Sequence, residues 1–370
     1  MRFLFTCGGT AGHINPALGV ADRLRQLIPK AEFLFIGAAG RMEADLVPRA
    51  GYPIRTIEID NLSRSISFSG LKHNVHTARL LMHATGTAKT IIAQFQPDVA
   101  VGTGGYVCYP ALKAAHSLGI PALVHESNAV PGLTTKLLAH TVDRVMLGFE
   151  QAAENYPKNV QTVFTGTPVR GDFSTCSKAE ARARLQLGFP DKPLVLSVWG
   201  SLGSGHINSM MPEFARMVAE HGDFNLIHSA GKGGYGRLDV GALNAPGVDI
   251  RDYIYDMPAV MAAADLIICR SGASTLGELA ALGAPALLIP SPNVTNHQQE
   301  KNAQLLRDLG AAQVLREGDF DAAGLYRASL DLLKSPETLK NMGEAMRRSA
   351  PPDAAGRIAD LILAFVSRKK

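Results

Sequence analysis

The chain opens with the stretch RFLFTCGGTAGHINP (residues 2–16), and a second stretch of the same kind, LIICRSGASTLGE (residues 266–278), lies in its other half. In each, a short apolar run suited to a buried strand leads into a glycine-rich turn and then into a helix-like segment. Such a turn gathers backbone N–H groups and the positive end of a helix at one point, which favours phosphate. Two such turns in opposite halves predict one ligand held between two domains.

Length and composition bound the class of protein. A chain of 370 residues, at roughly 150 residues per domain, predicts two domains, and 46% hydrophobic residues can fill two cores. The four cysteines (Cys7, Cys108, Cys176 and Cys269) form no C-x-x-C pair, so neither a zinc site nor a dense disulfide framework is expected. A reducing cytoplasm fits this cysteine usage best.

Charge and hydropathy limit the partners. The net charge of +4 falls far short of the clustered charge of nucleic-acid binders, so we expect no nucleic-acid partner, while attraction to an anionic membrane surface stays open. The N-terminus enters an apolar strand after two residues, and no apolar run approaches 18 residues. We therefore expect neither a signal peptide nor a membrane-spanning helix.

Apolar runs of strand length alternate with helix-like segments, which predicts α/β domains with parallel sheets covered by helices on both faces. Turn residues accumulate at 165–171, so we place the first domain at 1–167 and the second at 168–352. The tail 353–370 has apolar residues at helical spacing and is expected to pack back on the first domain. Residues 118–123 and 282–287 share a pattern, which either duplication or the common use of Gly and Pro in helix-to-strand turns explains.

The first turn is not a dinucleotide fingerprint. Residues 8–12 lack the G-x-G-x-x-G spacing, and the strand ending at Ile36 is not followed by the usual ribose-binding acid, so a nicotinamide dehydrogenase is disfavoured. His13 is predicted to stand at the start of the following helix. His13 either takes part in the chemistry at this turn or is a structural residue that caps the turn.

The second half offers a carboxylate and more phosphate-binding backbone. Glu278 lies one helical turn beyond Ser274, where it either accepts hydrogen bonds from a vicinal diol such as ribose or merely complements a helix N-terminus. The turn WGSLGSG (199–205) follows another apolar run and would add N–H donors for a diphosphate. No P-loop occurs, and the one Asp-x-Asp, Asp319 with Asp321, is interpreted as helix-capping. We expect no metal site and no required cofactor, with a divalent cation at most stimulatory.

With these residues laid out, the chain resembles the MurG family (glycosyltransferase family 28), and the similarity runs nearly end to end. The motifs that carry it are GGTAGHINPA (8–17), RMEADLVP (41–48), GGYV (104–107), HESN (125–128), PVR (168–170), RSGA (270–273) with Glu278, and QQ (298–299). The resemblance implies a GT-B fold, with two Rossmann-like, doubly wound domains facing a cleft. It also implies an inverting transfer of N-acetylglucosamine (GlcNAc) from UDP-GlcNAc, held mainly by the second domain.

The implied acceptor is undecaprenyl-diphospho-N-acetylmuramoyl-pentapeptide (lipid I), and the implied product is lipid II with a β-1,4 bond. The resemblance further implies a peripheral enzyme on the cytoplasmic face of the bacterial membrane, acting in cell-wall synthesis, cell shape and division, with other cell-wall or division proteins as candidate partners.

Site residues are carried over by motif position. Those implied to contact the donor are Thr10, Ala11, Gly12, Asn128, Arg170, Ser201, Ile254, Ala273, Ser274, Thr275, Glu278, Gln298 and Gln299. Among them, Glu278 would bind the ribose, Ile254 the uracil through its backbone, Ser201 with 273–275 the diphosphate, and Gln298 and Gln299 the sugar hydroxyls. Those implied on the acceptor side are Gly104, Gly105, Tyr106 and Glu126. His13 matches the residue that acts as base or stabilises the leaving diphosphate.

Two departures and two alternatives accompany this reading. The family's usual Gly-Gly-Ser-Gln-Gly turn is Trp-Gly-Ser-Leu-Gly at 199–203, so Leu202 removes an amide donor; Ala11 replaces a common glycine at little cost if its φ is negative. The alternatives are a GT-B enzyme with another lipid acceptor, such as diacylglycerol, and a non-catalytic nucleotide-sugar sensor.

Apolar and basic residues also mix between positions 64 and 89. The apolar ones are Ile66, Phe68, Leu71, Leu80, Leu81 and Met82, and the basic ones are Arg64, Lys72, Arg79 and Lys89. This mixture predicts either a membrane-docking surface or a helix face that packs on the core.

Overall fold

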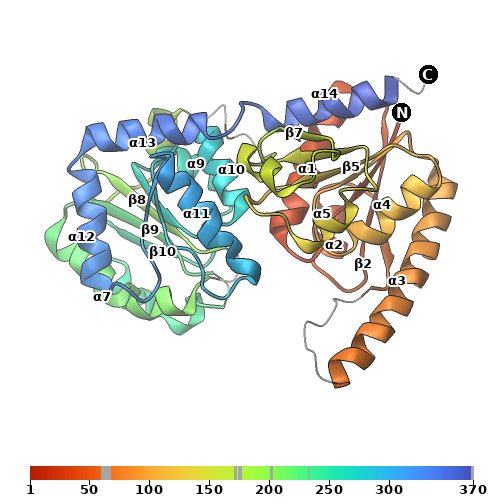
Figure 1. The fold of residues 1–370 in the computed structure, drawn as a ribbon. Helices are drawn as coiled ribbons and strands as arrows, with labels where there is room; N and C mark the ends of the chain where they lie inside the picture. The colour runs from red at the N-terminus through yellow and green to blue at the C-terminus, as the bar shows by residue number, and fades with distance from the viewer. Residues whose placement is uncertain (60–67, 171–172, 174–176, 201–202, 232, 368–370) are drawn as a thin grey trace. The chain divides into compact units, whose positions relative to one another are not determined.

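The computed structural model describes residues 1–59, 68–170, 173, 177–200, 203–231 and 233–367. Its contacts divide the chain into two compact units. Unit 1 consists of Met1–Arg170 with Pro351–Lys370, and unit 2 of Gly171–Ala350. Figure 1 shows unit 1 from red to yellow together with the blue C-terminal helix, and unit 2 from green to blue.

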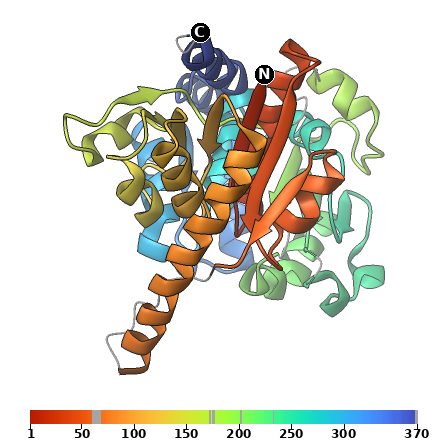
Figure 2. The ribbon, with the colours of Figure 1, turned by 90° about the vertical axis from the view of Figure 1, so that its right-hand side faces the viewer.

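Unit 1 is built on a sheet of seven parallel strands in the order β3-β2-β1-β4-β5-β6-β7. The strands are β1 (Arg2–Thr6), β2 (Glu32–Ala38), β3 (Ile54–Ile57), β4 (Val99–Gly102), β5 (Ala122–Glu126), β6 (Arg144–Leu147) and β7 (Thr162–Phe164). The helices are α1 (Ala11–Leu27), α2 (Glu43–Arg49), α3 (Phe68–Phe95), α4 (Cys108–Ser117), α5 (Leu133–Leu138), the 3₁₀ helix η1 (Glu150–Asn155) and α14 (Ala354–Ser367). Figure 2 shows the long helix α3 extending past the end of the sheet.

The core of unit 1 joins the two ends of the chain. Ile358 and Ile362 of α14 are buried in the same apolar cluster as Phe3 of β1 and Leu18 of α1. The strands supply continuous apolar runs because helices cover both faces of the parallel sheet.

Unit 2 is built on six parallel strands in the order β10-β9-β8-β11-β12-β13. The strands are β8 (Leu194–Val198), β9 (Asn225–Ser229), β10 (Val248–Arg251), β11 (Leu266–Cys269), β12 (Ala286–Leu288) and β13 (Ala312–Val314). The helices are α6 (Lys178–Ala183), α7 (Gly205–His221), η2 (Tyr235–Arg237), α8 (Val240–Leu243), α9 (Met257–Ala263), α10 (Ala273–Leu282), η3 (Thr295–His297), α11 (Gln298–Asp308), α12 (Ala322–Leu333) and α13 (Pro336–Arg348). Parallel α/β architecture in both halves confirms the prediction from the alternating pattern.

Strand order locates where ligands bind in each unit. The direction of the connections reverses at β1, which lies between β2 and β4, and at β8, which lies between β9 and β11. In doubly wound sheets a crevice opens outside the carboxyl ends of the strands at such a point. The glycine turns that follow Thr6, Val198 and Cys269 stand at those ends.

The structure bears on two further expectations, the capping role of the Asp-x-Asp pair and the presence of a membrane-spanning helix. Asp321 caps α12, its side chain accepting a hydrogen bond from the Gly324 N–H at 2.7 Å, which confirms its predicted capping role. Among the helices of the described residues, none combines the length and apolar character that crossing a membrane requires.

Candidate active site

The first glycine turn is held from behind by a buried carboxylate. Glu43, at the start of α2, is fully buried; its Oε2 accepts from the Gly9 N–H at 3.0 Å and its Oε1 from the Ala38 N–H at 2.9 Å. A Cβ on Gly8 would lie 2.5 Å from Glu43 Oε1, so the turn needs a glycine there. Sequence reasoning quoted Glu43 within a motif but gave it no role. No local signal marked it, because Glu43 stands beside other charged residues, Arg41 and Asp45, and lies 34 residues from Gly9.

The His13 ring is oriented by the same turn. α1 begins at Ala11, which confirms the predicted helix start, and His13 Nδ1 lies 2.9 Å from the Gly8 carbonyl oxygen. Because a carbonyl can only accept, Nδ1 carries the proton of the neutral ring and Nε2 keeps its lone pair. The His13 carbonyl accepts a further hydrogen bond from Thr103 Oγ1 at 2.7 Å. The arrangement presents Nε2 as a proton acceptor.

The predicted acceptor-side glycines lie against His13. Gly104 and Gly105 follow β4 with φ of +117° and +87°, which favour glycine, and the Gly104 carbonyl accepts from the Gly8 N–H at 3.2 Å. A Cβ on Gly104 would lie 2.5 Å from His13 Cδ2. The half-buried Tyr106 ring comes near Gly9, where a Cβ would lie 3.9 Å from its Cε1. The structure therefore brings the first turn, His13 and residues 104–106 together.

Glu126 supports the loop that carries Asn128. It is buried at the end of β5; its Oε1 accepts from both the backbone and the side-chain N–H of Asn128 at 3.0 Å, and its Oε2 accepts from the Gly132 N–H at 2.8 Å. Both carboxylate oxygens are thus engaged within the loop. The neighbouring His125 is buried, which lowers its pKa, and its Nε2 donates to the Gly166 carbonyl at 2.9 Å.

Arg170 lies apart from His13 within unit 1. Its Nε donates to Asp22 Oδ2 at 3.2 Å, and Asp22 Oδ1 also accepts from Arg25 and from the Tyr52 hydroxyl, each at 2.8 Å. Asp22 is nine residues along α1 from His13, about 13 Å along the helix axis. Arg170 is therefore fixed at the far half of α1 rather than beside His13.

In unit 2 the turn after β8 carries two glycines in the left-handed region. Gly200 and Gly203 have φ of +79° and +75°, and the Gly203 N–H donates to the Gly200 carbonyl at 3.1 Å. Ser204 caps α7. Ser201 and Leu202, the predicted phosphate contact and the departure from the family pattern, lie outside the described residues.

The turn after β11 leads into α10, which begins at Ala273 with Gly272 as its N-cap. Residues 273–275 form its first turn, at the positive end of the helix, and no acidic residue stands among them. Glu278 follows one turn later and is half-buried; burial raises its pKa from 4.5 to about 7. A carboxyl group poised near neutrality therefore lies beside a helix N-terminus suited to phosphate.

Gln299 joins two loops of unit 2. Its Oε1 accepts from the Ser291 N–H at 2.9 Å, and its backbone carbonyl accepts from Ser271 Oγ at 2.7 Å. Gln298 begins α11 directly after Asn296 and His297, whose φ of 56° and 51° are left-handed and unusual for side chains. The structure therefore brings residues 298–299 to the turn after β11.

Ile254 lies in the loop between β10 and α9 and is 2% exposed, between Tyr253 and Tyr255, which are 37% and 83% exposed. This loop follows the edge strand of the sheet, so in strand order Ile254 is the predicted donor contact farthest from Glu278.

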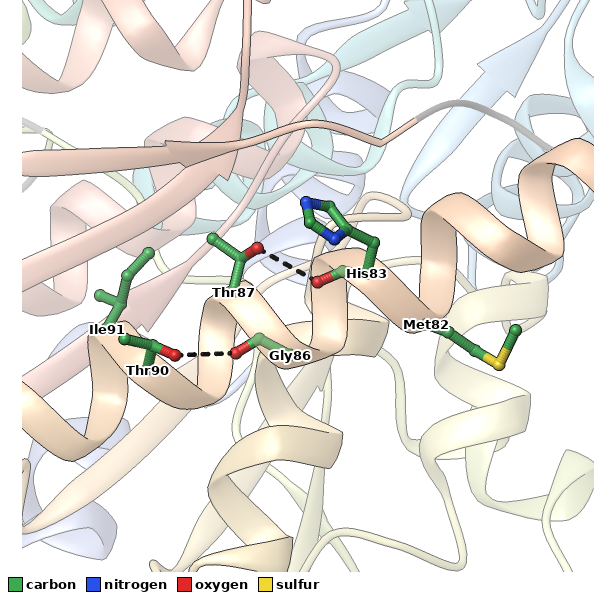
Figure 3. A pocket seen from close by; sticks show the side chains of 6 residues that line it. All are labelled: Met82, His83, Gly86, Thr87, Thr90 and Ile91. Atoms are coloured by element: carbon green, nitrogen blue, oxygen red, sulfur yellow. Dashed lines mark hydrogen bonds between the residues drawn. The ribbon is translucent and has the colours of Figure 1, made fainter.

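A hollow of about 550 Å³ lies along α3 of unit 1. It is lined by Met82, His83, Gly86, Thr87, Thr90 and Ile91 (Figure 3). Thr87 Oγ1 donates to the His83 carbonyl at 3.1 Å and Thr90 Oγ1 to the Gly86 carbonyl at 3.2 Å, so these hydroxyls are satisfied within the helix. None of the lining residues belongs to the predicted site.

Two parallel Rossmann-like sheets, each with a glycine turn at its switch point, give the chain the GT-B architecture. Residues 3–147 match the glycosyltransferase family 28 N-terminal domain, and residues 194–358 match the glycosyltransferase family 28 C-terminal domain. The chain belongs to glycosyltransferase family 28, which confirms the resemblance drawn from its motifs.

Full-length relatives are named for one reaction. The UDP-N-acetylglucosamine--N-acetylmuramyl-(pentapeptide) pyrophosphoryl-undecaprenol N-acetylglucosamine transferase of Acetivibrio thermocellus is 39% identical over 372 residues, covering 100% of this chain and 99% of the relative. The transferase of the same name from Alkaliphilus oremlandii is 37% identical over 373 residues, covering all of both chains. Acinetobacter baumannii MurG has a similar crystal structure, with a TM-score of 0.76, 28% identity, and coverage of 98% of this chain and 99% of that one.

Proposed function

We propose that the protein transfers GlcNAc from UDP-GlcNAc to the C4 hydroxyl of the N-acetylmuramoyl group of lipid I, giving lipid II with a β-1,4 bond. The observation that carries this proposal is the end-to-end similarity to transferases named for that donor and acceptor. The orientation of His13 by the first glycine turn supports it, because such a transfer needs a base at the acceptor hydroxyl.

The proposed mechanism is a single inverting displacement. The acceptor C4 hydroxyl attacks the anomeric carbon of GlcNAc while the bond to the diphosphate breaks, and His13 Nε2 takes the hydroxyl proton. UDP leaves with the bonding electron pair. Backbone N–H groups at helix N-termini would stabilise the charge that grows on the diphosphate. This scheme requires neither a covalent enzyme intermediate nor a metal.

The donor would be held mainly by unit 2. Glu278 accepts from the ribose hydroxyls, residues 273–275 with Ser201 bind the diphosphate, Ile254 binds the uracil through its backbone, and Gln298 with Gln299 binds the sugar. For Gln299 the side-chain amide N–H₂ would do so, because its Oε1 already accepts from Ser291. From unit 1 the proposed donor contacts are Thr10, Ala11, Gly12, Asn128 and Arg170.

Residues 1–167 with the tail 353–370 would receive the acceptor, and 168–352 the donor. On the acceptor side, Gly104, Gly105 and Tyr106 stand next to His13, whereas Glu126 would act through the loop it supports. Ser127, which hydrogen-bonds to His125 at 3.1 Å, belongs to that same buried support.

We further propose that unit 1 docks peripherally on an anionic membrane at its cytoplasmic face, because the lipid tail of the acceptor is anchored there. Met82 is 69% exposed and Lys89 is exposed on the same helix. Arg64 and Ile66 lie outside the described residues, as do the side chains of Phe68, Leu71, Lys72 and Arg79. Cosedimentation with anionic vesicles tests this, and absence of binding at low salt would contradict it.

The test of the reaction is transfer of labelled GlcNAc from UDP-GlcNAc to a lipid I analogue, with parallel reactions that omit the acceptor or offer diacylglycerol. Disaccharide formation that depends on lipid I is expected. Transfer to diacylglycerol alone would indicate another lipid acceptor. Binding of UDP-GlcNAc without any transfer would indicate a nucleotide-sugar sensor.

A further inference from the structure

Arg270 joins the ends of four neighbouring strands in unit 2. It follows β11 directly, its Nη1 donates to the Ile289 carbonyl just after β12 at 3.0 Å, and the same nitrogen pairs with Glu317 beyond β13. Its Nη2 donates to Ser204 Oγ, at the N-cap of α7 after β8, at 2.9 Å. Because β8, β11, β12 and β13 are consecutive in the sheet, one side chain fixes all four ends.

The guanidinium group is specifically required for these contacts. The Arg270 and Glu317 side chains are only 16% and 12% exposed, so the ion pair is largely shielded from water. Arginine presents several N–H groups in a rigid planar fork, whereas lysine offers one compact ammonium group that cannot reach the same partners together. A lysine at this position would keep the charge and lose the geometry.

The face of Arg270 is backed by Trp199, whose ring centroid lies 5.3 Å from the guanidinium carbon. Trp199 is 4% exposed and stands where the family pattern usually has a glycine. Its Nε1–H donates to Ser197 Oγ at 2.8 Å, and the Ser197 hydroxyl donates in turn to His228 Nδ1 at 2.9 Å. The indole is therefore held at both its face and its edge.

The chain of hydrogen bonds continues beneath the turn. His228 Nε2 donates to Asn208 Oδ1 at 3.0 Å, and Asn208 Nδ2 donates to the Ala230 carbonyl at 2.9 Å. The direction is fixed, because an indole N–H can only donate and a carbonyl can only accept. His228 is fully buried, which lowers its pKa to about 3, so the imidazole stays neutral. A Cβ on Gly203 would clash with the same Ala230 carbonyl, so the turn rests on the end of this chain.

We propose that Arg270 is a positioning residue for the donor diphosphate: it holds the Gly200–Gly203 turn and the start of α7 in fixed relation to the start of α10, with Trp199 as its backing. The inference rests on the proposed function, because it takes the diphosphate to lie at these two helix N-termini. Arg270 acts through the backbone it anchors. Its loss would spread the two sets of N–H donors apart while leaving the uracil-binding loop intact.

The experiment compares wild type, Arg270→Lys and a matched control, Arg182→Lys. Arg182 also makes a partly buried ion pair, with Asp265 at 2.7 Å, but at the amino ends of β8 and β11, opposite to the strand ends that Arg270 joins; there Asp265 also accepts from the Leu194 N–H. Calorimetry gives the dissociation constant for UDP, and saturation-transfer NMR gives that for uridine, which lacks the phosphates. Trp199 is the only tryptophan of the chain, so its fluorescence reports on this turn alone.

Arg270→Lys is expected to weaken UDP binding by about 10- to 100-fold, leave uridine binding close to wild type, and change the Trp199 emission. Arg182→Lys should change none of the three. Glu317→Gln, which keeps the arginine and its other partners, should weaken UDP selectively but less. It replaces Arg270→Lys in the comparison if that variant does not fold.

Three results would overturn the inference, and they are distinguishable. Wild-type UDP affinity in Arg270→Lys would refute the positioning role and leave the proposed function standing. Equal weakening of UDP and uridine would show that Arg270 only maintains the fold of unit 2. Failure of the wild type to bind UDP would overturn the proposed function and this inference together.

Discussion

Replacing Glu278 by glutamine should make the protein more stable at alkaline pH while impairing donor binding. Burial raises the pKa of Glu278 from 4.5 to about 7. The folded state therefore holds the proton more tightly than the unfolded state, and stability falls as pH rises from about 4.5 to about 7. Above that range the folded protein bears the whole cost of an ionised, partly buried carboxylate, and glutamine removes that cost.

The magnitude follows from the shift. One pKa unit corresponds to about 1.4 kcal/mol. A change in pKa from 4.5 to about 7 then corresponds to about 3 kcal/mol in total, of which about 2 kcal/mol falls between pH 5.5 and pH 8.5. Because water still reaches part of this half-buried group, about 2 kcal/mol is an upper value for that interval.

The assay is urea unfolding of wild type and Glu278→Gln at pH 5.5 and pH 8.5. Glu344→Gln is the control, an exposed glutamate on α13 of the same unit, whose side chain is 47% exposed. The stability difference between Glu278→Gln and wild type should grow in favour of the variant from pH 5.5 to pH 8.5, and the control should show no such growth. UDP binding by wild type should strengthen across the same interval, because an ionised carboxylate accepts stronger hydrogen bonds from the ribose hydroxyls than a protonated one. A variant that gains no stability between the two pH values would refute the reasoning.

Three further predictions concern the first glycine turn. His13→Ala is expected to slow transfer by about 10²–10⁴-fold, measured by initial rates, with UDP affinity near wild type by calorimetry; nearly full turnover would remove His13 as the base. Gly104→Ala places a methyl group 2.5 Å from His13 Cδ2 at a φ of +117°, so both the thermal midpoint and the transfer rate should fall. The control Gly40→Ala has a φ of +67° and no neighbour within 4 Å, so it should show only the backbone strain, about 1–3 kcal/mol, and its activity should persist. Glu43→Gln turns one carboxylate oxygen into an N–H₂ group facing a backbone N–H, which should destabilise unit 1 by about 1–3 kcal/mol in urea unfolding; unchanged stability would contradict the bonding described for Glu43.

The local sequence pattern was enough to predict much of the fold and part of the candidate site. The apolar runs of β1 and β11, each followed by glycines and a helix, predicted strand, turn and helix correctly because these depend on residues adjacent in sequence. The placement of His13 in the first turn of α1, and of Glu278 one turn further into α10, follows from the same local rule. Roles beyond placement came from the family motifs and not from periodicity.

Other features had no local signal. Glu43 bonds Gly9 across 34 residues, and Thr103 bonds His13 across 90. Arg270 reaches Ser204 across 66. Spacing along the chain does not predict such pairs. Yet Glu43 holds the glycine turn after β1, and Arg270 bonds Ser204 just after the glycine turn that follows β8.

The amino-acid sequence by itself determined two α/β units, their glycine turns, and the helix starts that carry His13 and Glu278, because backbone conformation and amphipathic periodicity are properties of neighbouring residues. Only the tertiary structure decided that β4 lies beside β1 and so packs Gly104 on His13, and that β8, β11, β12 and β13 end close enough for one guanidinium to join them. It also decided the proton position on His13 and the raised pKa of Glu278. These depend on which distant groups strand order brings into contact and on how much water they exclude.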